Sequence, residues 1–201
     1  MSRNSAPSVI ALAGPNGAGK STTGPDLLKD TLGITEFVNA DLIAQGLSPF
    51  APDRAAVAAG RIMLDRLRHL ARQRTTFAFE TTLSGLAYVR WITGLIDSGY
   101  HFHVVFLWLP SAEHAIARVA DRVRRGGHHV PDEIVRRRYH GGLRNFLRLF
   151  RPLATTWRLY DNASGDRPQL VAKGGTASEL RIADESIWHQ VTRGVEYGHQ
   201  T

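Results

Sequence analysis

The chain has 201 residues, which suits one α/β domain and is short for two. Hydrophobic residues make up 43% of it, which argues against a disordered chain, and the absence of cysteine excludes disulfides, a thiolate nucleophile and a cysteine-type zinc site. The formal net charge is +7 and comes mostly from arginine, since only three of the 25 basic residues are lysines, and guanidinium groups match phosphate oxygens with paired donors.

Strands and helices are predicted to alternate along the chain. In chain order, they are a strand at 8–13, a helix from 21 to about 31, a strand at 36–40, a helix from 52 to about 74, a strand at 76–79, a helix at 84–97, a strand at 101–109, helices at 112–125 and 131–150, strands at 157–161 and 169–172, and a helix at about 183–193. This alternation predicts a P-loop-type three-layer sandwich, in which a mostly parallel sheet carries helices on both faces and binds ligands at the carboxyl ends of its strands.

The sequence contains no internal repeat and no low-complexity linker, so we expect one domain over residues 1–201. Within it we expect a flexible tail at 1–7, a lid at about 118–138 and a C-terminal helical tail at about 175–201. The apolar run near the N-terminus is too short for a membrane span or a signal peptide, so we expect a cytoplasmic protein with no membrane partner.

A phosphate-binding loop follows the first predicted strand. It matches the pattern G-x-x-x-x-G-K-[ST] in full, and the candidate nucleotide-binding residues are Gly14, Pro15, Asn16, Gly17, Ala18, Gly19, Lys20, Ser21 and Thr22. Backbone N–H groups of such a loop surround phosphate oxygens, the lysine reaches the β- and γ-phosphates, and the serine hydroxyl ligates Mg²⁺. We therefore expect ATP and Mg²⁺ as cofactors, because no guanine-recognition motif is present.

Two carboxylates follow predicted strands. A kinase needs a carboxylate near the acceptor hydroxyl to orient it and take its proton, and Asp41 stands where the second strand ends. The alternative for Asp41 is a helix N-cap. Glu80 ends the third strand, which is the position of an acid that holds Mg²⁺, and Thr81 and Thr82 add hydroxyl groups beside it.

An arginine-rich segment occupies residues 118–151. Arg118, Arg122 and Arg125 recur on one face of a predicted helix, and residues 136–138 are all arginine. Arginines in such positions stabilise the charge that develops during phosphoryl transfer, whereas the alternative for any single arginine is a solvated surface. Two other readings remain open, a nucleic-acid-associated protein and a P-loop ATPase without an acceptor. Nucleic acid is the less favoured partner because aromatic residues are not interleaved with the arginines.

Four motifs together resemble the zeta-toxin-like kinases, and in particular their compact chromosomal branch. They are Gly14–Thr22, Val38-Asn39-Ala40-Asp41, the run from Phe79 to Gly85 and the run from Gly126 to Pro131. The resemblance covers about residues 9–172. It implies a fold related to small-molecule kinases, ATP-dependent phosphorylation of the 3′-hydroxyl of the sugar in UDP-N-acetylglucosamine, and an antitoxin partner that blocks the ATP site.

The resemblance also implies roles for single residues. Asp41 matches the catalytic base, and Glu80 matches a glutamate that contacts the sugar, so the choice between Mg²⁺ and substrate stays open for Glu80. Thr81 and Thr82 are candidate substrate contacts. The better-known toxins carry an arginine roughly where His128 stands here, so the arginine for the γ-phosphate is chosen from Arg122 and Arg137, followed by Arg118.

Overall fold

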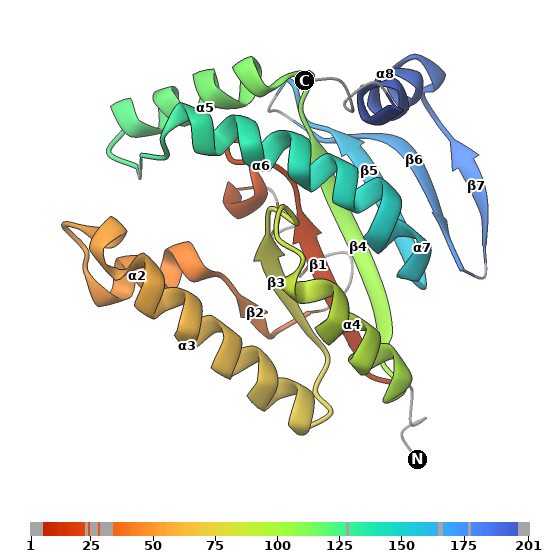
Figure 1. The fold of residues 1–201 in the computed structure, drawn as a ribbon, viewed down its shortest axis with the longest axis horizontal. Helices are drawn as coiled ribbons and strands as arrows, with labels where there is room; N and C mark the ends of the chain where they lie inside the picture. Colours follow the sequence, from red (N-terminus) through yellow and green to blue (C-terminus); the bar gives the residue numbers. More distant parts are fainter. Residues whose placement is uncertain are drawn as a thin grey trace.

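A computed structural model describes residues 6–22, 24, 28, 34–127, 129–164, 167–176 and 178–196. Its centre is a seven-stranded sheet in the order β2-β3-β1-β4-β5-β6-β7, with helices on both faces (Figure 1). The first five strands in this order are parallel, while β6 and β7 are antiparallel to their neighbours. The predicted mostly parallel α/β sandwich is therefore confirmed.

The strands are β1 (Ser8–Ala13), β2 (Phe37–Val38), β3 (Phe77–Thr81), β4 (His101–Trp108), β5 (Thr156–Asp161), β6 (Gln169–Gly175) and β7 (Ser178–Ile182). The helices are α2 (Ala40–Leu47), α3 (Pro52–Arg72), α4 (Ala87–Asp97), α5 (Ala112–Arg124), α6 (Asp132–Asn145), a π-helical turn at Phe146–Phe150, α7 (Arg151–Leu153) and α8 (Glu185–Glu196). Of the helix predicted at 21–31, the described residues Ser21, Thr22, Gly24 and Leu28 are helical, and the rest lies outside the described residues.

The central strands are apolar on both faces because helices cover both. On one face, Phe77, Phe79 and Phe106 pack against side chains from α3, α4, α6 and α8 in the largest core cluster. On the other face, Ile10 and Leu12 pack against Leu28. A third cluster joins residues of α5 to Leu107 near the end of β4. Strands buried on both faces read as continuous hydrophobic runs, which is why β1 and β4 were predictable.

Several elements differ from the prediction: the helix predicted from 84 begins at Ala87, and the helix predicted at 131–150 is divided into α6 and a π-helical turn. Two further differences concern the edge of the sheet and the site. Residues 178–182 form β7 at the edge of the sheet, so the C-terminal tail expected to be helical from about 175 contains a strand before α8. All five residues of β7 are exposed, so its sequence lacks the buried run that marks the central strands. The second difference is that β2 ends at Val38 and α2 begins at Ala40, one residue before Asp41.

The carboxyl ends of the parallel strands meet at one edge of the sheet. The loop after β1, the start of α2 after β2, the end of β3 and the loop after β5 all lie there. In open α/β sheets ligands bind at this edge, so the fold brings the phosphate loop, Asp41 and Glu80 to one place. Within the described part of the chain, no helix has the length and apolar character needed to cross a bilayer.

Candidate active site

The loop after β1 is held in a tight phosphate-loop conformation. Gly17 has a φ of 79°, and a Cβ on it would lie 2.8 Å from the Ala115 carbonyl oxygen, so only glycine fits. The side chain of Lys20 lies inside the loop, where its Nζ donates to the carbonyl oxygens of Gly14 at 2.9 Å and Pro15 at 2.8 Å. The loop thus holds its lysine at the position where phosphates are expected.

The charge of Lys20 is balanced by two carboxylates. Burial lowers the pKa of Lys20 from its ordinary value, while the negative charges of Glu80 and Asp41 oppose that shift. Glu80 Oε1 lies 3.7 Å from Lys20 Nζ, and both side chains are nearly buried. A cation and an acid so placed keep the site close to electrical balance until a charged ligand enters.

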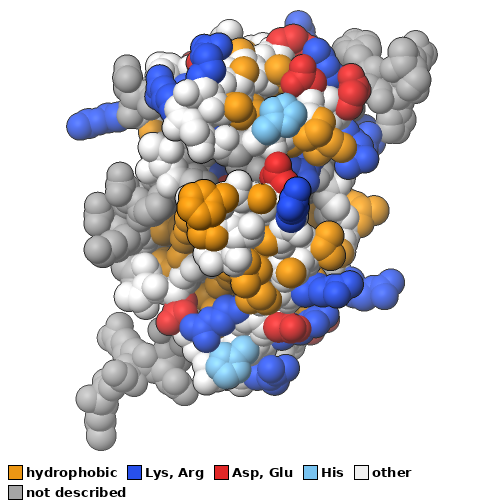
Figure 2. Space-filling view, turned by 90° about the vertical axis from the view of Figure 1, so that its left-hand side faces the viewer, with side chains coloured by type: hydrophobic (Ala, Val, Ile, Leu, Met, Phe, Trp, Pro, Cys, Tyr) orange, Lys and Arg blue, Asp and Glu red, His pale blue; other side chains and the backbone are white. Residues whose placement is uncertain are grey.

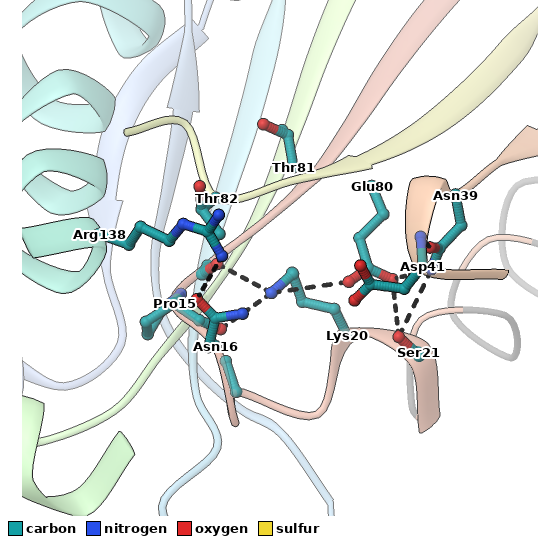
Figure 3. A network of polar contacts seen from close by, with 12 residues as sticks. Pro15, Asn16, Lys20, Ser21, Asn39, Asp41, Glu80, Thr81, Thr82 and Arg138 are labelled. Atoms are coloured by element: carbon teal, nitrogen blue, oxygen red, sulfur yellow. Dashed lines mark hydrogen bonds and ion pairs between the residues drawn. The ribbon is translucent and has the colours of Figure 1, made fainter. Parts of the chain in front are cut away.

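Glu80 is the centre of a small polar network (Figure 3). Its Oε2 accepts from Ser21 Oγ at 2.9 Å and from Asn39 Nδ2 at 2.6 Å. Lys20, Ser21 and Asn39 therefore all direct polar atoms at one carboxylate. The sequence predicted Ser21 and Glu80 separately, and the fold joins them.

Asn39 is a site residue that the sequence reasoning did not assign. It is buried between β2 and α2, where its Oδ1 accepts from the backbone N–H groups of Asp41 at 2.7 Å and Leu42 at 3.2 Å. It is thus the N-cap of α2, while its amide nitrogen donates to Glu80. The sequence feature that could have identified Asn39 is its place directly before a short helical segment, since asparagine is a preferred N-cap residue.

Asp41 lies in the first turn of α2, exposed at the mouth of the site. The alternative that Asp41 itself caps the helix is wrong, because Asn39 does so. Its carboxylate is close enough to Lys20 and to Arg138 to influence the ionisation of both. Its negative charge also suits the positive end of the helix dipole.

A cavity of about 670 Å³ opens over the phosphate loop. The loop supplies one wall, and α5 with its C-cap residue supplies another through Arg118, Arg122 and Arg125, while Glu80 and Asp41 also line the cavity. The three arginines predicted to share a helix face therefore all line this cavity. Its size and its cationic lining fit a nucleoside triphosphate.

A second cavity, of about 600 Å³, lies beside the first. It is formed by α2, the loop to α3, the start of α3 and the turn between α5 and α6, on the face that Figure 2 shows. Figure 2 shows hydrophobic side chains gathered on this face. Leu42 and Phe50 line the cavity and are exposed. Four residues line both cavities, namely Ser21, Asp41, Arg122 and Gly127.

Arg122 is positioned by the turn that ends α5. Gly126, with a φ of 85°, donates its N–H to the Val123 carbonyl, and Gly127 donates to the Arg122 carbonyl at 2.9 Å, which is the Schellman pattern. A Cβ on Gly127 would lie 2.5 Å from Arg122 Cγ. Glycine at 127 therefore leaves the room that the Arg122 side chain occupies between the two cavities.

The other candidates for an arginine that contacts the γ-phosphate differ in where they lie relative to the first cavity and the phosphate loop. Arg118 donates to the carbonyl oxygens of Asn162 at 2.9 Å and Ala163 at 3.3 Å, on the far wall of the first cavity. Neither Arg137 nor Arg138 lines either cavity, and Arg137 is on the exposed side of α6. The neighbouring Arg138 is half-buried and donates to Asn16 Oδ1 in the phosphate loop at 3.3 Å, so the geometry favours it over Arg137.

Thr81 and Thr82 lie at the end of β3, away from both cavity linings. The Thr81 hydroxyl accepts from the Leu83 N–H, and its side chain points away from the polar network in Figure 3. The Thr82 hydroxyl is 2.9 Å from the Ser84 hydroxyl. His128, the position of the expected departure from the toxins, lies outside the described residues.

Comparisons with known proteins place this geometry in a family. The model of an AAA domain family (AAA_33) matches residues 9–140. An uncharacterized protein of Haemophilus influenzae is 31% identical over 130 residues, which make up 65% of this chain and 91% of that protein.

Several solved structures share the fold. The structure of AvrRxo1-ORF1:-ORF2 with ATP has a TM-score of 0.73 at 17% identity, over 94% of this chain and 64% of that one, so this chain spans less than two thirds of its length. A chain from the PezAT chromosomal toxin-antitoxin system of Streptococcus pneumoniae has a TM-score of 0.63 at 14% identity, over 98% of this chain and 87% of that one. A putative kinase from Chloroflexus aurantiacus has a TM-score of 0.58 at 13% identity, over 98% and 100%. The chain therefore belongs to the AAA domain family matched over residues 9–140 and has a P-loop kinase-like fold.

Proposed function

We propose that the protein is an ATP-dependent kinase that transfers the γ-phosphate to a hydroxyl of a small molecule. The observation that carries this proposal is the meeting of two cavities at Asp41 and Arg122. A hydrolase needs one cavity and a water, whereas a phosphotransferase needs a donor site and an acceptor site joined where the reacting atoms meet.

The residues at the junction fit the chemistry of transfer. Asp41, in the first turn of α2, accepts the proton of the acceptor hydroxyl and orients its oxygen toward the phosphate. Lys20 and the loop amides hold the β- and γ-phosphates in the first cavity. Arg122 lies between the cavities, where a guanidinium stabilises the charge on the transferred group.

The donor set beside Lys20 also fits Mg²⁺. The Ser21 hydroxyl and the Glu80 carboxylate are in direct contact, and both are oxygen donors of the kind that Mg²⁺ prefers. We propose that these two side chains hold the ion, directly or through water, which favours the metal role of Glu80 over the substrate role. When bound there, Mg²⁺ neutralises phosphate charge.

The acceptor that we propose is a nucleotide sugar such as UDP-N-acetylglucosamine. The support is the resemblance to zeta-toxin-like kinases, together with a second cavity that combines exposed apolar residues with charged ones such as Asp53 and Arg54. Thr81 and Thr82 keep their proposed substrate roles only if the acceptor reaches the end of β3. A kinase with another small-molecule acceptor is the alternative.

We also propose that an antitoxin-like protein binds over the nucleotide site. Two of the similar structures come from a two-protein complex and from a toxin-antitoxin system. The lining of the first cavity includes Arg118, Arg122 and Arg125, which would suit an acidic partner surface.

Mass spectrometry of a small-molecule extract incubated with the protein, ATP and Mg²⁺ tests the function. We expect one or more metabolites to gain a single phosphate, and UDP-N-acetylglucosamine assayed alone to be among them. The matched control is Lys20→Ala, which should give no product. Release of ADP without any phosphorylated metabolite would support an ATPase and contradict the kinase.

A further inference from the structure

One face of the sheet is exposed and basic at β5 and β6. On the opposite face, Trp157 and Leu159 of β5 and Ala172 of β6 are buried in the main core cluster, together with side chains of α8. Successive side chains of a strand point to opposite faces. Arg158 and Lys173, which are next to these buried residues in the sequence, are accordingly exposed on the other face.

Three cations form a row across the strands. Arg158 pairs directly with Lys173 of β6, and Lys173 pairs directly with Arg181 of β7. Directly paired residues place their side chains on the same face, and like charges in such pairs destabilise a sheet. None of the three is in an ion pair within the part of the chain that the structure describes. The row therefore keeps three neighbouring positive charges at a cost in stability.

The three cations line one cavity of about 490 Å³. Every residue that lines this cavity belongs to β5, β6 or β7, and the lining also contains the hydroxyl groups of Thr156 and Ser178 and one acid, Glu179. Three cations against one acid leave the lining net positive. The cavity shares no lining residue with the proposed nucleotide cavity, which Asn162 lines just past the other end of β5.

The positive charge of this face influences the neighbouring strand. His103 of β4 lies beside the cavity, with its Nδ1 2.8 Å from the Thr156 hydroxyl. Burial lowers the pKa of His103, and the positive charges of His101 and Arg158 lower it further. A histidine that resists protonation is the response expected next to a cation that no acid neutralises.

We propose that this cavity binds an oligophosphate group, such as inorganic triphosphate, with Arg158, Lys173 and Arg181 as its cationic contacts. Guanidinium and ammonium groups hold phosphate oxygens through charge-assisted hydrogen bonds. Neighbouring strands are about 4.8 Å apart, so the row presents successive cations along a chain of phosphates. Trp157, the aromatic residue of the lining, is only 5% exposed and offers no face on which a base could stack. Recognition therefore depends on the phosphates and not on a nucleoside.

Isothermal titration calorimetry with inorganic triphosphate, without Mg²⁺, tests the site in the Lys20→Ala variant. This variant lacks the phosphate-loop lysine, so binding in the nucleotide cavity does not mask the second site. We expect a dissociation constant below about 1 mM. Replacing Arg158, Lys173 and Arg181 together by Gln should raise it about tenfold or more, because three charged donors are lost.

The matched control replaces Arg61, Arg72 and Arg90 by Gln. These three arginines are exposed on α3 and α4, so the control removes the same net charge away from the cavity and should change the constant less than about twofold. Glu179→Gln removes the acid of the lining and should tighten binding about twofold, which misfolding cannot imitate. The triple variant at 158, 173 and 181 should melt no lower than wild type, because it removes like-charged pairs.

The wild type provides a second measurement that does not depend on the Lys20→Ala variant. It should take up triphosphate at two sites, and the triple variant at 158, 173 and 181 should take it up at one. A single site in the wild type, lost in Lys20→Ala, would overturn the second site and leave the proposed kinase function intact. Equal weakening in the triple variant and its control would overturn it as well. Tighter binding of a trinucleotide than of triphosphate would do the same, since it would show that bases are recognised.

Discussion

With one side chain, Asn39 contacts the backbone of the proposed base Asp41 and the carboxylate of the proposed metal ligand Glu80. Its oxygen caps the helix that presents Asp41, and its nitrogen donates to Glu80. Because the two ends of one amide serve two elements, Asn39 fixes the start of α2 relative to the end of β3. The distance between the proposed base and the proposed metal ligand depends on it.

Replacement of Asn39 separates these two functions. Asn39→Ser keeps a good capping oxygen but loses the donor to Glu80, so stability should stay within about 1 kcal/mol of wild type. Turnover should fall about tenfold, because Glu80 loses its closest partner. Asn39→Ala should lose a further 1 kcal/mol or so of stability. Urea unfolding measures the stability of the variants, and a coupled ADP assay measures their turnover. Equal turnover in Asn39→Ser and wild type would contradict a positioning role for Asn39.

Adjacent arginines offer a matched pair of substitutions. Arg138 donates to Asn16 in the phosphate loop, while Arg137 is exposed on α6. Arg138→Ala should raise the KM for ATP about tenfold, since it removes a charge-assisted hydrogen bond from the loop. Arg137→Ala should change it less than about twofold. The reverse order in steady-state kinetics would support Arg137 as the phosphate-contacting residue.

At the scale of single residues, the sequence predicted those site residues that a local sequence pattern identifies. The phosphate loop and the arginines at 118, 122 and 125 were predicted because their spacing identifies them, and Glu80 because it ends an apolar strand. Asn39 and Arg138 were not singled out, because their importance comes from contacts 41 and 122 residues away in sequence. No local pattern records such contacts.

At the scale of elements, α6 is fastened to the sheet by a buried tyrosine. Tyr139 donates its hydroxyl to the Leu109 carbonyl at 2.8 Å, just past the end of β4. This contact fixes the helix next to Arg138, and burial raises the pKa of Tyr139 to about 12.

The shifted pKa of Tyr139 predicts a pH dependence of stability. The folded protein favours the neutral phenol, whereas the unfolded chain loses the proton near pH 10, so this contribution should be complete below about pH 10 and lost as pH rises toward 12. Tyr139→Phe should cost about 1 kcal/mol at pH 8. Urea unfolding at pH 8 and 11 should show the gap between the two proteins shrinking. An equal gap at both values would argue against the buried phenol.

The elements that were predicted correctly are those with a strong hydrophobic period. The strands β1 and β4 are continuous apolar runs, and α3 repeats its buried residues at helical spacing. The edge strand β7 was missed because none of its residues is buried. The strand β7 pairs with β6 as a hairpin. Five exposed residues show no pattern of burial from which this hairpin could be predicted.

At the scale of the whole molecule, the charge distribution agrees with a phosphate-binding role. Arg118, Arg122 and Arg125 line the first cavity, and the loop and the helix after it add backbone donors. The net charge of +7 therefore includes cations concentrated at the proposed ligand site. A lid motion of residues 118–138 stays a prediction.

Nucleotide binding should stabilise the whole fold. ATP with Mg²⁺ at about 100 times its dissociation constant should add about 2.7 kcal/mol and raise the Tm by about 5–10 °C. Lys20→Ala should abolish this shift, and Glu80→Gln should abolish the part that depends on Mg²⁺. A thermal melt with ATP, with and without EDTA, measures both. A full shift in Lys20→Ala would place the nucleotide elsewhere.

The most direct measurement is the rate of phosphate transfer by Asp41→Asn alongside its affinity for ATP. Asparagine keeps the shape of the side chain but cannot accept the proton, so transfer should fall by about 100-fold or more while ATP affinity stays within about threefold. Transfer at the wild-type rate would contradict the assignment of the cavity junction as the reaction centre.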